Sequence, residues 1–318
     1  DENAADGAVN EGDKPSVSIA ATDAQSIEGV DNVLSFTVEQ DSESNFDTTV
    51  QVTVDPSSDV EAADIASIIY INATGDQVVI TDATVIAEVL DGSTILELKV
   101  PAGSQTAPAI IVTTNNDDIF ESSEQLSFVV TSADNADIDS AVATGTILDE
   151  DAVDGTPQAG DKPTAIVTRD SVVEGSTLEF TVDLSNLSES DTTVALTLAN
   201  GTAVLGTDTN TSVEVSLDGG NTFSTVTVAI DGTFSVDVPA NSTDGIIVRV
   251  PTVDDNIDEP NETITLTASA TDQVTPSTAT GTIIDNDDAP VVSIVGATLV
   301  NEDAGTVTYT VSLTNPSS

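Results

Sequence analysis

Apolar and polar residues alternate along several short runs of this chain. The clearest runs are residues 50–54, 194–198, 213–217 and 234–238. A period of two predicts a strand with one buried face and one solvent face. Asp91-Gly92, Asp218-Gly219-Gly220 and Asp231-Gly232 separate such runs and are typical of hairpins and turns. No segment has sustained helical periodicity, so the sequence predicts an all-β protein.

Short strands at this spacing predict a two-sheet sandwich of the immunoglobulin-like kind, with a barrel as the alternative. Apolar residues make up 38% of the chain, but aromatic residues only 3%. The core must therefore consist mainly of Val, Ile, Leu and Ala side chains. Val and Thr are abundant throughout, and β-branched side chains favour pleated, half-buried surfaces.

The chain contains internal repeats. Asp13-Lys14-Pro15 returns as Asp161-Lys162-Pro163. A second motif, an alternating apolar run, occurs at residues 34–38, 178–182 and 307–311. Motifs that recur in the same order indicate tandem copies of one structural unit. Because the spacing between matched motifs varies, loops of different length must separate the matched strands.

The repeats predict two complete sandwich modules arranged in tandem, with parts of two more. The expected boundaries are a tail or linker of a preceding module at 1–12, module 1 at 13–151, a linker at 152–160, module 2 at 161–288, and the start of a third module at 289–318. The parent protein is therefore expected to continue in both directions. The linker contains Gly and Pro and is expected to be flexible unless Asp151, Asp154 and Asp161 bind a cation.

The charge of the chain is extreme. Fifty-six acidic residues accompany five basic ones, for a formal net charge of −51. Such a surface repels nucleic acid and anionic membranes, so neither is an expected partner. The acids serve either as a solvated surface or as ligands of hard cations. The chain has no Cys and no His, which excludes Cys/His zinc sites, Cys nucleophiles and Ser-His-Asp triads. It also lacks an apolar run of membrane-spanning length.

The positions of the acids favour the cation hypothesis. Acids recur at matched places near predicted strand ends, as the pairs Glu28 and Glu174, Asp117 and Asp255, Glu121 and Glu259, and Glu124 and Glu262. Calcium takes six to eight oxygen ligands, mainly from carboxylates and carbonyls. Adjacent carboxylates repel one another unless a cation lies between them. Isolated acids such as Asp76 and Asp231 are instead expected to cap turns.

The order of these motifs resembles the Calx-β domain family. The matching motifs of module 1 are Glu28-Gly29, then Asp117 with Glu121 and Glu124, then Gly145-Thr146-Ile147 before Asp149-Glu150-Asp151; those of module 2 are Glu174-Gly175, then Asp255 with Glu259 and Glu262, then Gly281-Thr282-Ile283 before Asp285-Asn286-Asp287-Asp288. The resemblance covers both complete modules and the start of the third. It implies that calcium (Ca2+) binds at one end of each sandwich.

The ligands that the resemblance implies are an early Glu, acids in the middle of the domain, and the terminal Asp run. Carried over, they are Glu28, Asp117, Glu121, Asp149 and Asp151 in module 1, and Glu174, Asp255, Glu259, Asp285 and Asp287 in module 2. A middle-loop Asp of the family corresponds to Asp64 and Asp208. Glu150 and Asn286 interrupt the terminal Asp runs, which would lower the number of ions bound.

Residues 216–240 also resemble repeats of giant bacterial RTX adhesins, which are exported by type I secretion. That resemblance implies an extender that projects a distal binding region from the bacterial cell surface for attachment or biofilm formation. It further implies an extracellular, monomeric rod in which calcium stiffens the junctions and whose partners are neighbouring repeats of the same chain. An enzyme is not expected, because paired carboxylates that recur in each module suit metal binding better than acid–base catalysis.

Two other functions remain open from the sequence. One is a sugar- or protein-binding module at an adhesin tip, although two Tyr, seven Phe and no Trp leave little for a sugar-stacking platform. The other is a calcium-sensing regulatory domain, which the Calx-β resemblance also implies.

Overall fold

The computed structural model describes residues 14–151, 155 and 157–318, and its contacts divide the chain into two units. The first unit is Asp1–Asp161 and the second is Lys162–Ser318. The predicted tail at 1–12, the boundary residue Asp13 and the linker residue Asp154 lie outside the described residues.

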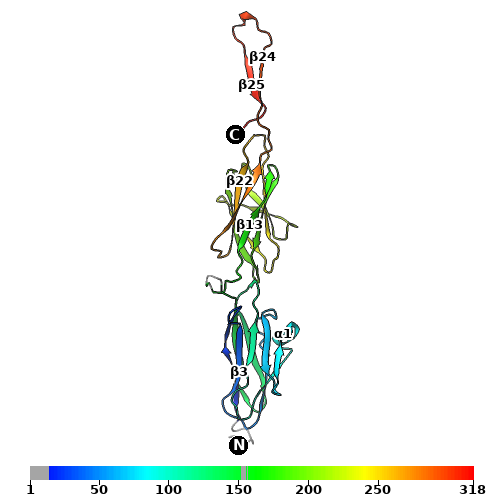
Figure 1. Ribbon diagram of the computed structural model, residues 1–318, viewed down its shortest axis with the longest axis vertical. Coiled ribbons are helices and arrows are strands. Elements are labelled where there is room, and N and C mark those ends of the chain that lie inside the picture. The colour runs from blue at the N-terminus through cyan, green and yellow to red at the C-terminus, as the bar shows by residue number, and fades with distance from the viewer. Residues whose placement is uncertain (1–13, 152–154, 156) are drawn as a thin grey trace. The chain divides into compact units, whose positions relative to one another are not determined.

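The first unit contains two sheets (Figure 1). One has the strand order β11-β1-β3-β8-β5-β6 and the other β2-β12-β10-β4-β7. The strands are β1 (Ser16–Asp23), β2 (Gln25–Ile27), β3 (Val33–Gln40), β4 (Thr48–Val54), β5 (Ile65–Ile71), β6 (Gln77–Ile80), β7 (Leu96–Val100), β8 (Ile110–Thr114), β9 (Ile119–Phe120), β10 (Glu124–Ala133), β11 (Asp137–Ser140) and β12 (Val142–Leu148). β9 lies outside both sheets.

The two sheets share one core, as a sandwich requires. Phe36 on β3 and Phe128 on β10 come from different sheets, are fully buried, and meet edge to face with ring centroids 4.9 Å apart. Aliphatic side chains surround them, in line with the composition. The prediction of an all-β sandwich is therefore confirmed, and the barrel alternative is not needed.

The second unit repeats this arrangement. Its sheets have the orders β13-β15-β21-β18-β19 and β14-β23-β22-β17-β20. The strands are β13 (Ala165–Arg169), β14 (Ser171–Val173), β15 (Thr177–Leu184), β16 (Leu187–Ser188), β17 (Thr192–Asn200), β18 (Ser212–Ser216), β19 (Ser224–Thr227), β20 (Thr233–Val238), β21 (Ile246–Pro251), β22 (Glu262–Ala270) and β23 (Ser277–Ile284). The alternating runs predicted as strands at 194–198 and 234–238 lie within β17 and β20, residues 213–216 lie within β18, and the run at 50–54 lies within β4 of the first unit.

A last hairpin completes the second unit and pairs β24 (Val292–Gly296) with β25 (Tyr309–Leu313); a short 3-10 helix, η1 (Glu302–Ala304), lies between them. Val292 faces Leu313 and Ile294 faces Val311, and all four side chains are exposed. The corresponding side chains of β13 and β15, Val167 and Val182, are buried. The hairpin thus has the pattern of the first strands of a module, and the third module stays a prediction.

One helix was not expected. Helix α1 (Ala83–Leu90) links β6 to β7 and buries Ile86 and Val89 in the core. Asp82 begins the helix, because its Oδ1 accepts hydrogen bonds from the backbone N–H groups of Thr84 and Val85. α1 could not be predicted from the sequence, because its eight residues are too few to show a sustained helical period.

The turn signals had three different outcomes. Asp218-Gly219-Gly220 lies in the hairpin between β18 and β19, as predicted. Asp91-Gly92 ends α1 instead of joining paired strands, with Gly92 in the left-handed region at φ +76°. Asp231-Gly232 forms a turn that leads from β19 in one sheet to β20 in the other, so it is a turn but not a hairpin.

A glycine in the last strand of each sandwich is required by core packing. A Cβ on Gly145 would lie 3.0 Å from Phe36 and 3.1 Å from Leu34. A Cβ on Gly281 would lie 2.6 Å from Leu178 and 3.0 Å from Phe180. The repeated Gly-Thr-Ile motif therefore reflects close packing of a Leu and a Phe beneath β12 and β23.

We expect Gly281→Val to destabilise the second unit by about 1–3 kcal/mol, because the side chain must displace Leu178 or Phe180 in a filled core. Thermal unfolding followed by calorimetry measures the change. Thr278→Val, on the exposed face of the same strand, is the control and should change stability much less. Equal effects of the two substitutions would contradict this account of the motif.

Candidate metal centres

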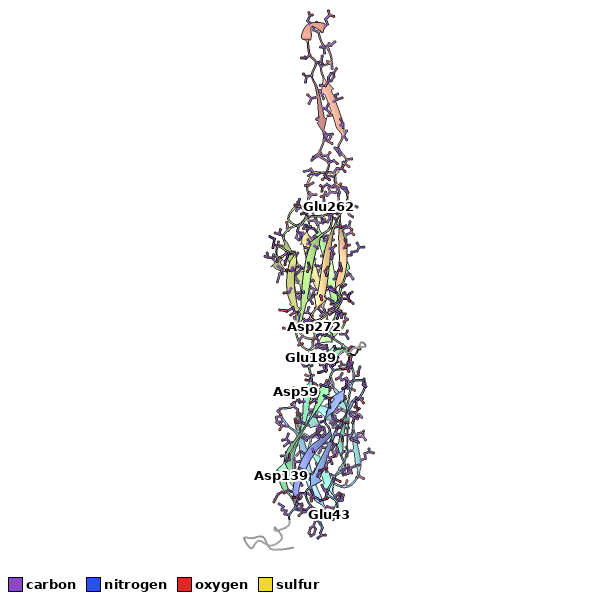
Figure 2. All side chains as sticks on the ribbon, turned by 90° about the vertical axis from the view of Figure 1, so that its left-hand side faces the viewer. Glu43, Asp59, Asp139, Glu189, Glu262 and Asp272 are labelled. Carbon is purple, nitrogen blue, oxygen red and sulfur yellow. The ribbon has the colours of Figure 1, made fainter. Side chains whose placement is uncertain are left out.

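Acidic side chains gather at one end of each sandwich. In the first unit, this is the end where β2 and β12 finish and where β5 and β10 begin. β2 runs parallel to β12, and β10 runs antiparallel to it, so the ends of β2 and β12 and the start of β10 coincide. In the second unit, Glu262 lies at the start of β22 and Asp272 at the opposite end of that sandwich (Figure 2).

The first unit has two clusters of carboxylates that could hold a metal ion. They are Glu28–Asp149–Glu150 and Asp64–Glu121–Glu124, and within each cluster one oxygen from every residue lies within 4.8 Å of the others. Glu28, Asp64 and Asp149 are each at most 5% exposed. Buried carboxylates at this separation are costly unless a cation or protons neutralise them.

The second unit repeats both clusters at matched positions. They are Glu174–Asp285–Asp287 and Asp208–Glu259–Glu262, again with oxygens within 4.8 Å of one another. These side chains are only partly buried, unlike most of those in the first unit. The pairing of strands β14 and β23 places Glu174 beside the terminal acid run, as the pairing of β2 and β12 does for Glu28.

The Glu-Gly step positions the first ligand candidate of each unit. The N–H of Glu28 donates to the carbonyl of Leu148 at 3.1 Å, and the N–H of Glu174 donates to the carbonyl of Ile284 at 3.0 Å. Gly29 and Gly175 follow with φ of +68° and +75°. A side chain at Gly29 would also collide with Asn116. Only glycine can therefore turn the chain there so soon after the glutamate.

The clustered carboxyl groups of the first unit have raised pKa values. Burial, with the nearby charges of Asp117, Asp149 and Asp64, raises the pKa of Glu28 to about 7. Burial also raises the pKa values of Asp64, Asp149 and Glu150. Without a cation these groups resist ionisation, and a bound cation would remove that penalty.

The second unit shows the same effect at its own clusters. Burial and the charges of Asp208 and Glu259 raise the pKa of Glu262 to about 7. Burial and neighbouring acids also raise the pKa values of Glu174 and Asp287. The repulsion is therefore a property of the repeated unit and not of one loop.

The donor set fits a hard cation. Oδ1 of Asp149 and Oδ2 of Asp287 are shielded from solvent and have no hydrogen-bond partner among the described residues. The ion pairs of Lys14, Lys99 and Arg249 use Asp137, Asp47 and Glu179, none of which belongs to a cluster. Carboxylate oxygens without other ligand types are suited to calcium or magnesium.

Most of the acids predicted as ligands lie in these four clusters, where their role as ligands stays a prediction; they are Glu28, Asp64, Glu121, Asp149, Glu174, Asp208, Glu259, Asp285 and Asp287. Asp117 and Asp255 lie outside the clusters. Each caps a turn, accepting from the N–H of Ile119 at 2.8 Å and of Ile257 at 2.7 Å. Asp151 also lies outside and accepts from the N–H of Gln158 at 3.2 Å.

Three cluster members were not among the predicted ligands. Glu124 and Glu262 recur at matched positions, and that repetition was the available signal. Glu150 appeared only as an interruption of the Asp run, and nothing in the sequence shows that its side chain turns inward. As expected, Asp76 and Asp231 accept hydrogen bonds within their own turns, from the hydroxyl groups of Thr74 and Thr233 respectively.

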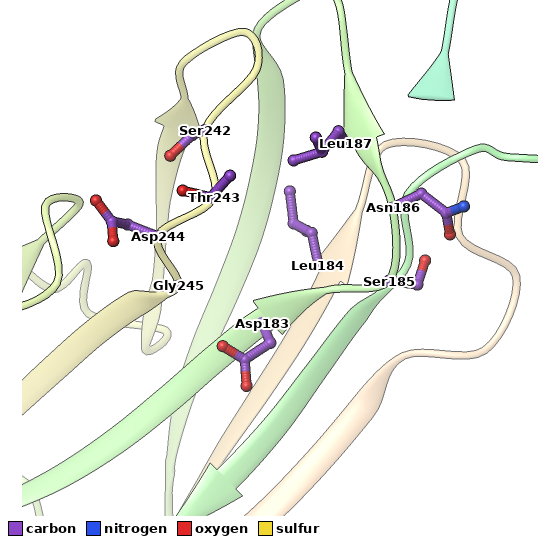
Figure 3. A pocket seen from close by; sticks show the side chains of 9 residues that line it. All are labelled: Asp183, Leu184, Ser185, Asn186, Leu187, Ser242, Thr243, Asp244 and Gly245. Carbon is purple, nitrogen blue, oxygen red and sulfur yellow. The ribbon is translucent and has the colours of Figure 1, made fainter. Parts of the chain in front are cut away.

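Two surface hollows lie away from the clusters. One of about 150 Å³ is lined by residues 183–187 and 242–245. Figure 3 shows Leu184 and Leu187 approaching each other there, while the carboxylates of Asp183 and Asp244 do not converge. Another, of about 290 Å³, lies beside β18, β19 and β20. Neither hollow contains a member of the four clusters. Among the described residues, no helix has the length and apolarity needed to cross a membrane.

Comparison with known proteins adds little to this geometry. No family model matches the chain, and no curated protein sequence matches it. Similar solved structures include CBD12 from CALX1.2, at 12% identity and a TM-score of 0.30, covering 80% of this chain and 83% of that one. The calcium binding domain CBD12 of CALX1.1 has 11% identity, a TM-score of 0.28 and 79% coverage of both chains.

A third similar structure, the apo-form Calx CBD1 domain, has 16% identity and a TM-score of 0.26, and covers 39% of this chain and 99% of that one. At such values the likeness carries no argument about chemistry, which depends here on the carboxylate clusters.

We expect the calcium-free protein to lose stability as the pH rises from about 4.5 to about 7. Glu28 and Glu262 have folded-state pKa values of about 7, above their usual 4.5, so the folded state binds more protons than the unfolded state across this range. Glu28→Gln should flatten the pH dependence and raise stability at pH 8 by about 1–3 kcal/mol. Denaturant unfolding after removal of calcium measures both effects.

The control for this prediction is Asp139→Asn, which changes an exposed acid outside the clusters. It should leave the pH profile unchanged. A wild-type protein whose calcium-free stability is constant between pH 5 and pH 8 would contradict the predicted repulsion.

Proposed function

We propose that both sandwich units bind calcium at their strand-end carboxylate clusters, and that the ions stabilise the units as structural repeats. The observation that carries the proposal is the recurrence of two clusters at matched places in two units, with a buried, unpartnered oxygen on Asp149. A single acidic loop is common on protein surfaces, but a repeated, partly buried pair of clusters has a cost that must be offset.

Calcium fits the clusters better than magnesium does. Calcium accepts six to eight oxygen ligands in flexible geometry, whereas magnesium requires a nearly ideal octahedron and retains several waters. Each unit offers two triads that contain both Asp and Glu, and such carboxylates can bind calcium through one oxygen or through both. Glu28, Asp149 and Glu150 would hold one ion, and Asp64, Glu121 and Glu124 another.

The ions would act structurally because of what their ligands connect. In the first unit, Glu28 follows β2, Asp149 follows β12 and Glu124 begins β10. The two ions held at these residues would fasten the ends of neighbouring strands and favour the folded state by mass action. No catalytic step is proposed.

We further propose that the units are extender repeats of a large bacterial cell-surface adhesin, and that the chain acts as an extracellular monomer. The support is the tandem repetition of one sandwich, the net charge of −51, the absence of Cys and the scarcity of aromatic side chains. The partners would be neighbouring repeats, whose acidic ends calcium would stiffen. This role also accounts for small surface hollows that are separate from the clusters.

Calcium sensing is a second candidate, favoured by the burial of Glu28, Asp64 and Asp149, which would couple ion binding to local order. Affinity distinguishes the two functions. Extracellular calcium modules bind with dissociation constants of about 10⁻⁴–10⁻³ M, and intracellular sensors with about 10⁻⁷–10⁻⁵ M. We expect isothermal titration calorimetry to give values in the extracellular range, and micromolar or tighter binding would favour sensing.

Calcium should raise the unfolding temperature of both units. At a calcium concentration 100 times the dissociation constant, the expected gain is about 2.7 kcal/mol for one site. Asp149→Asn should reduce the gain in the first unit only, and Asp285→Asn in the second unit only, because each removes one cluster carboxylate. Calorimetry with calcium and with excess EDTA measures these changes.

Asp139→Asn again provides the matched control, since it removes one negative charge without touching a cluster. It should retain the full calcium effect. The proposal fails if the melting curves with calcium and with EDTA coincide, or if Asp139→Asn lowers the gain as much as Asp149→Asn does.

A further inference from the structure

The chain that follows the terminal acid run of the first unit returns to that run. The N–H groups of Ala159 and Gly160 both donate to the carbonyl of Glu150, at 3.1 and 2.9 Å. The N–H of Gln158 donates to Oδ1 of Asp151 at 3.2 Å. These bonds bring Asp161 back beside Glu150, from which it is eleven positions away in the sequence.

The second unit has the equivalent acid without an insertion. Its run continues directly into Asp288, which stands two residues before Pro290, just as Asp161 stands two residues before Pro163. In the first unit, residues 152–160 separate Asp151 from Asp161. In the first unit, the hydrogen bonds to the Glu150 carbonyl therefore place Asp161 beside the terminal acid run. In the second unit, the corresponding Asp288 is beside that run because it follows directly in the sequence.

Asp161 reaches the cluster through Glu150. The carboxyl groups of Asp161 and Glu150 are hydrogen-bonded to each other, and Asp149, Asp117 and Asp118 lie near enough to interact electrostatically with Asp161. The Glu150 side chain also packs directly on Gly160, where any side chain would occupy its space.

A second observation points to a ligand at this place. Asp149 is 4% exposed, its Oδ1 has no hydrogen-bond partner among the described residues, and its carboxylate faces those of Glu28 and Glu150. Three carboxylates supply fewer oxygens than calcium prefers unless some bind through both oxygens. A fourth carboxylate beside Glu150 would help to complete the shell.

We propose that Asp161 is a further ligand of the divalent cation bound by Glu28, Asp149 and Glu150. Cation binding then holds Asp161 beside Glu150 and keeps the N–H groups of Ala159 and Gly160 hydrogen-bonded to the Glu150 carbonyl. Asp161 accordingly belongs to the site, although residues 152–160 stand between it and the terminal acid run in the sequence. This inference depends on the proposed function, because it assumes that the cluster binds calcium.

The test is Asp161→Asn in the full chain, with calcium as the probe. Isothermal titration calorimetry should show one site weakened about tenfold or more, while the other sites keep their affinity. As an independent readout, NMR hydrogen exchange at the Ala159 and Gly160 amides should slow when calcium is added to the wild type, but not to the variant. Asp170→Asn, an exposed acid outside the clusters, is the matched control and should behave as the wild type does.

The possible outcomes separate this inference from the proposed function. If the wild type and Asp161→Asn bind calcium with equal affinity and equal amide protection, Asp161 is not a ligand, and the calcium proposal stands. If the wild type itself binds no calcium, both proposals fail. A variant with weakened binding must have a calcium-free melting temperature no lower than that of the wild type, since a misfolded variant would be evidence against a specific ligand role.

Discussion

Mutual repulsion of carboxylates at the sandwich ends is the constraint on which the structure depends. Two triads in each unit bring their oxygens within 4.8 Å of one another, in a chain with a formal net charge of −51. Burial increases the repulsion between these carboxylates, because a low-dielectric environment screens charges less than water does. The pKa values of Glu28 and Glu262, both raised to about 7, express that cost. Either protons or cations must offset it, and at neutral pH cations are the more effective.

The β-sandwich can tolerate such clusters because its stability comes from the apolar core and not from the strand ends. The core of each unit is a continuous set of aliphatic side chains around a few Phe rings, with Gly145 and Gly281 allowing close packing beneath the last strand. Backbone ladders then fix where the loops emerge. β2 runs parallel to β12, and β14 runs parallel to β23. The Glu that follows β2 or β14 therefore lies beside the acid run that follows β12 or β23.

Much of the fold could be predicted from the sequence, because period-two alternation encodes burial directly. The runs at residues 50–54 and 194–198 became central strands for that reason. Helix α1 could not be predicted, since its two buried residues, Ile86 and Val89, are too few to define a period. Asp91-Gly92 forms a turn, as predicted, but the turn ends that helix and does not join paired strands.

The candidate site was predictable only at the level of which acids recur. The recurrence of Glu28 and Glu174 located the correct end of the sandwich. It could not tell a carboxylate that caps a turn, such as Asp117 on the N–H of Ile119, from one that points into a cluster. Nor could it show that Glu150 turns inward, because that depends on the returning chain at Ala159 and Gly160. Side-chain direction in loops is set by tertiary hydrogen bonds that have no local sequence pattern.

The two units are not equivalent, and the difference has a physical consequence. Where the first unit has Glu150, the second has Asn286, whose side-chain amide donates to Oδ1 of Asp254 at 3.1 Å and whose backbone N–H donates to Oε1 of Glu174 at 3.2 Å. The second unit thus has a neutral hydrogen-bond donor at the position where the first unit adds a further carboxylate, that of Glu150. The clusters of the second unit are also less buried. A cation there removes less repulsion and displaces existing hydrogen bonds, so the first unit should depend on calcium more strongly than the second, even though their strands follow the same plan.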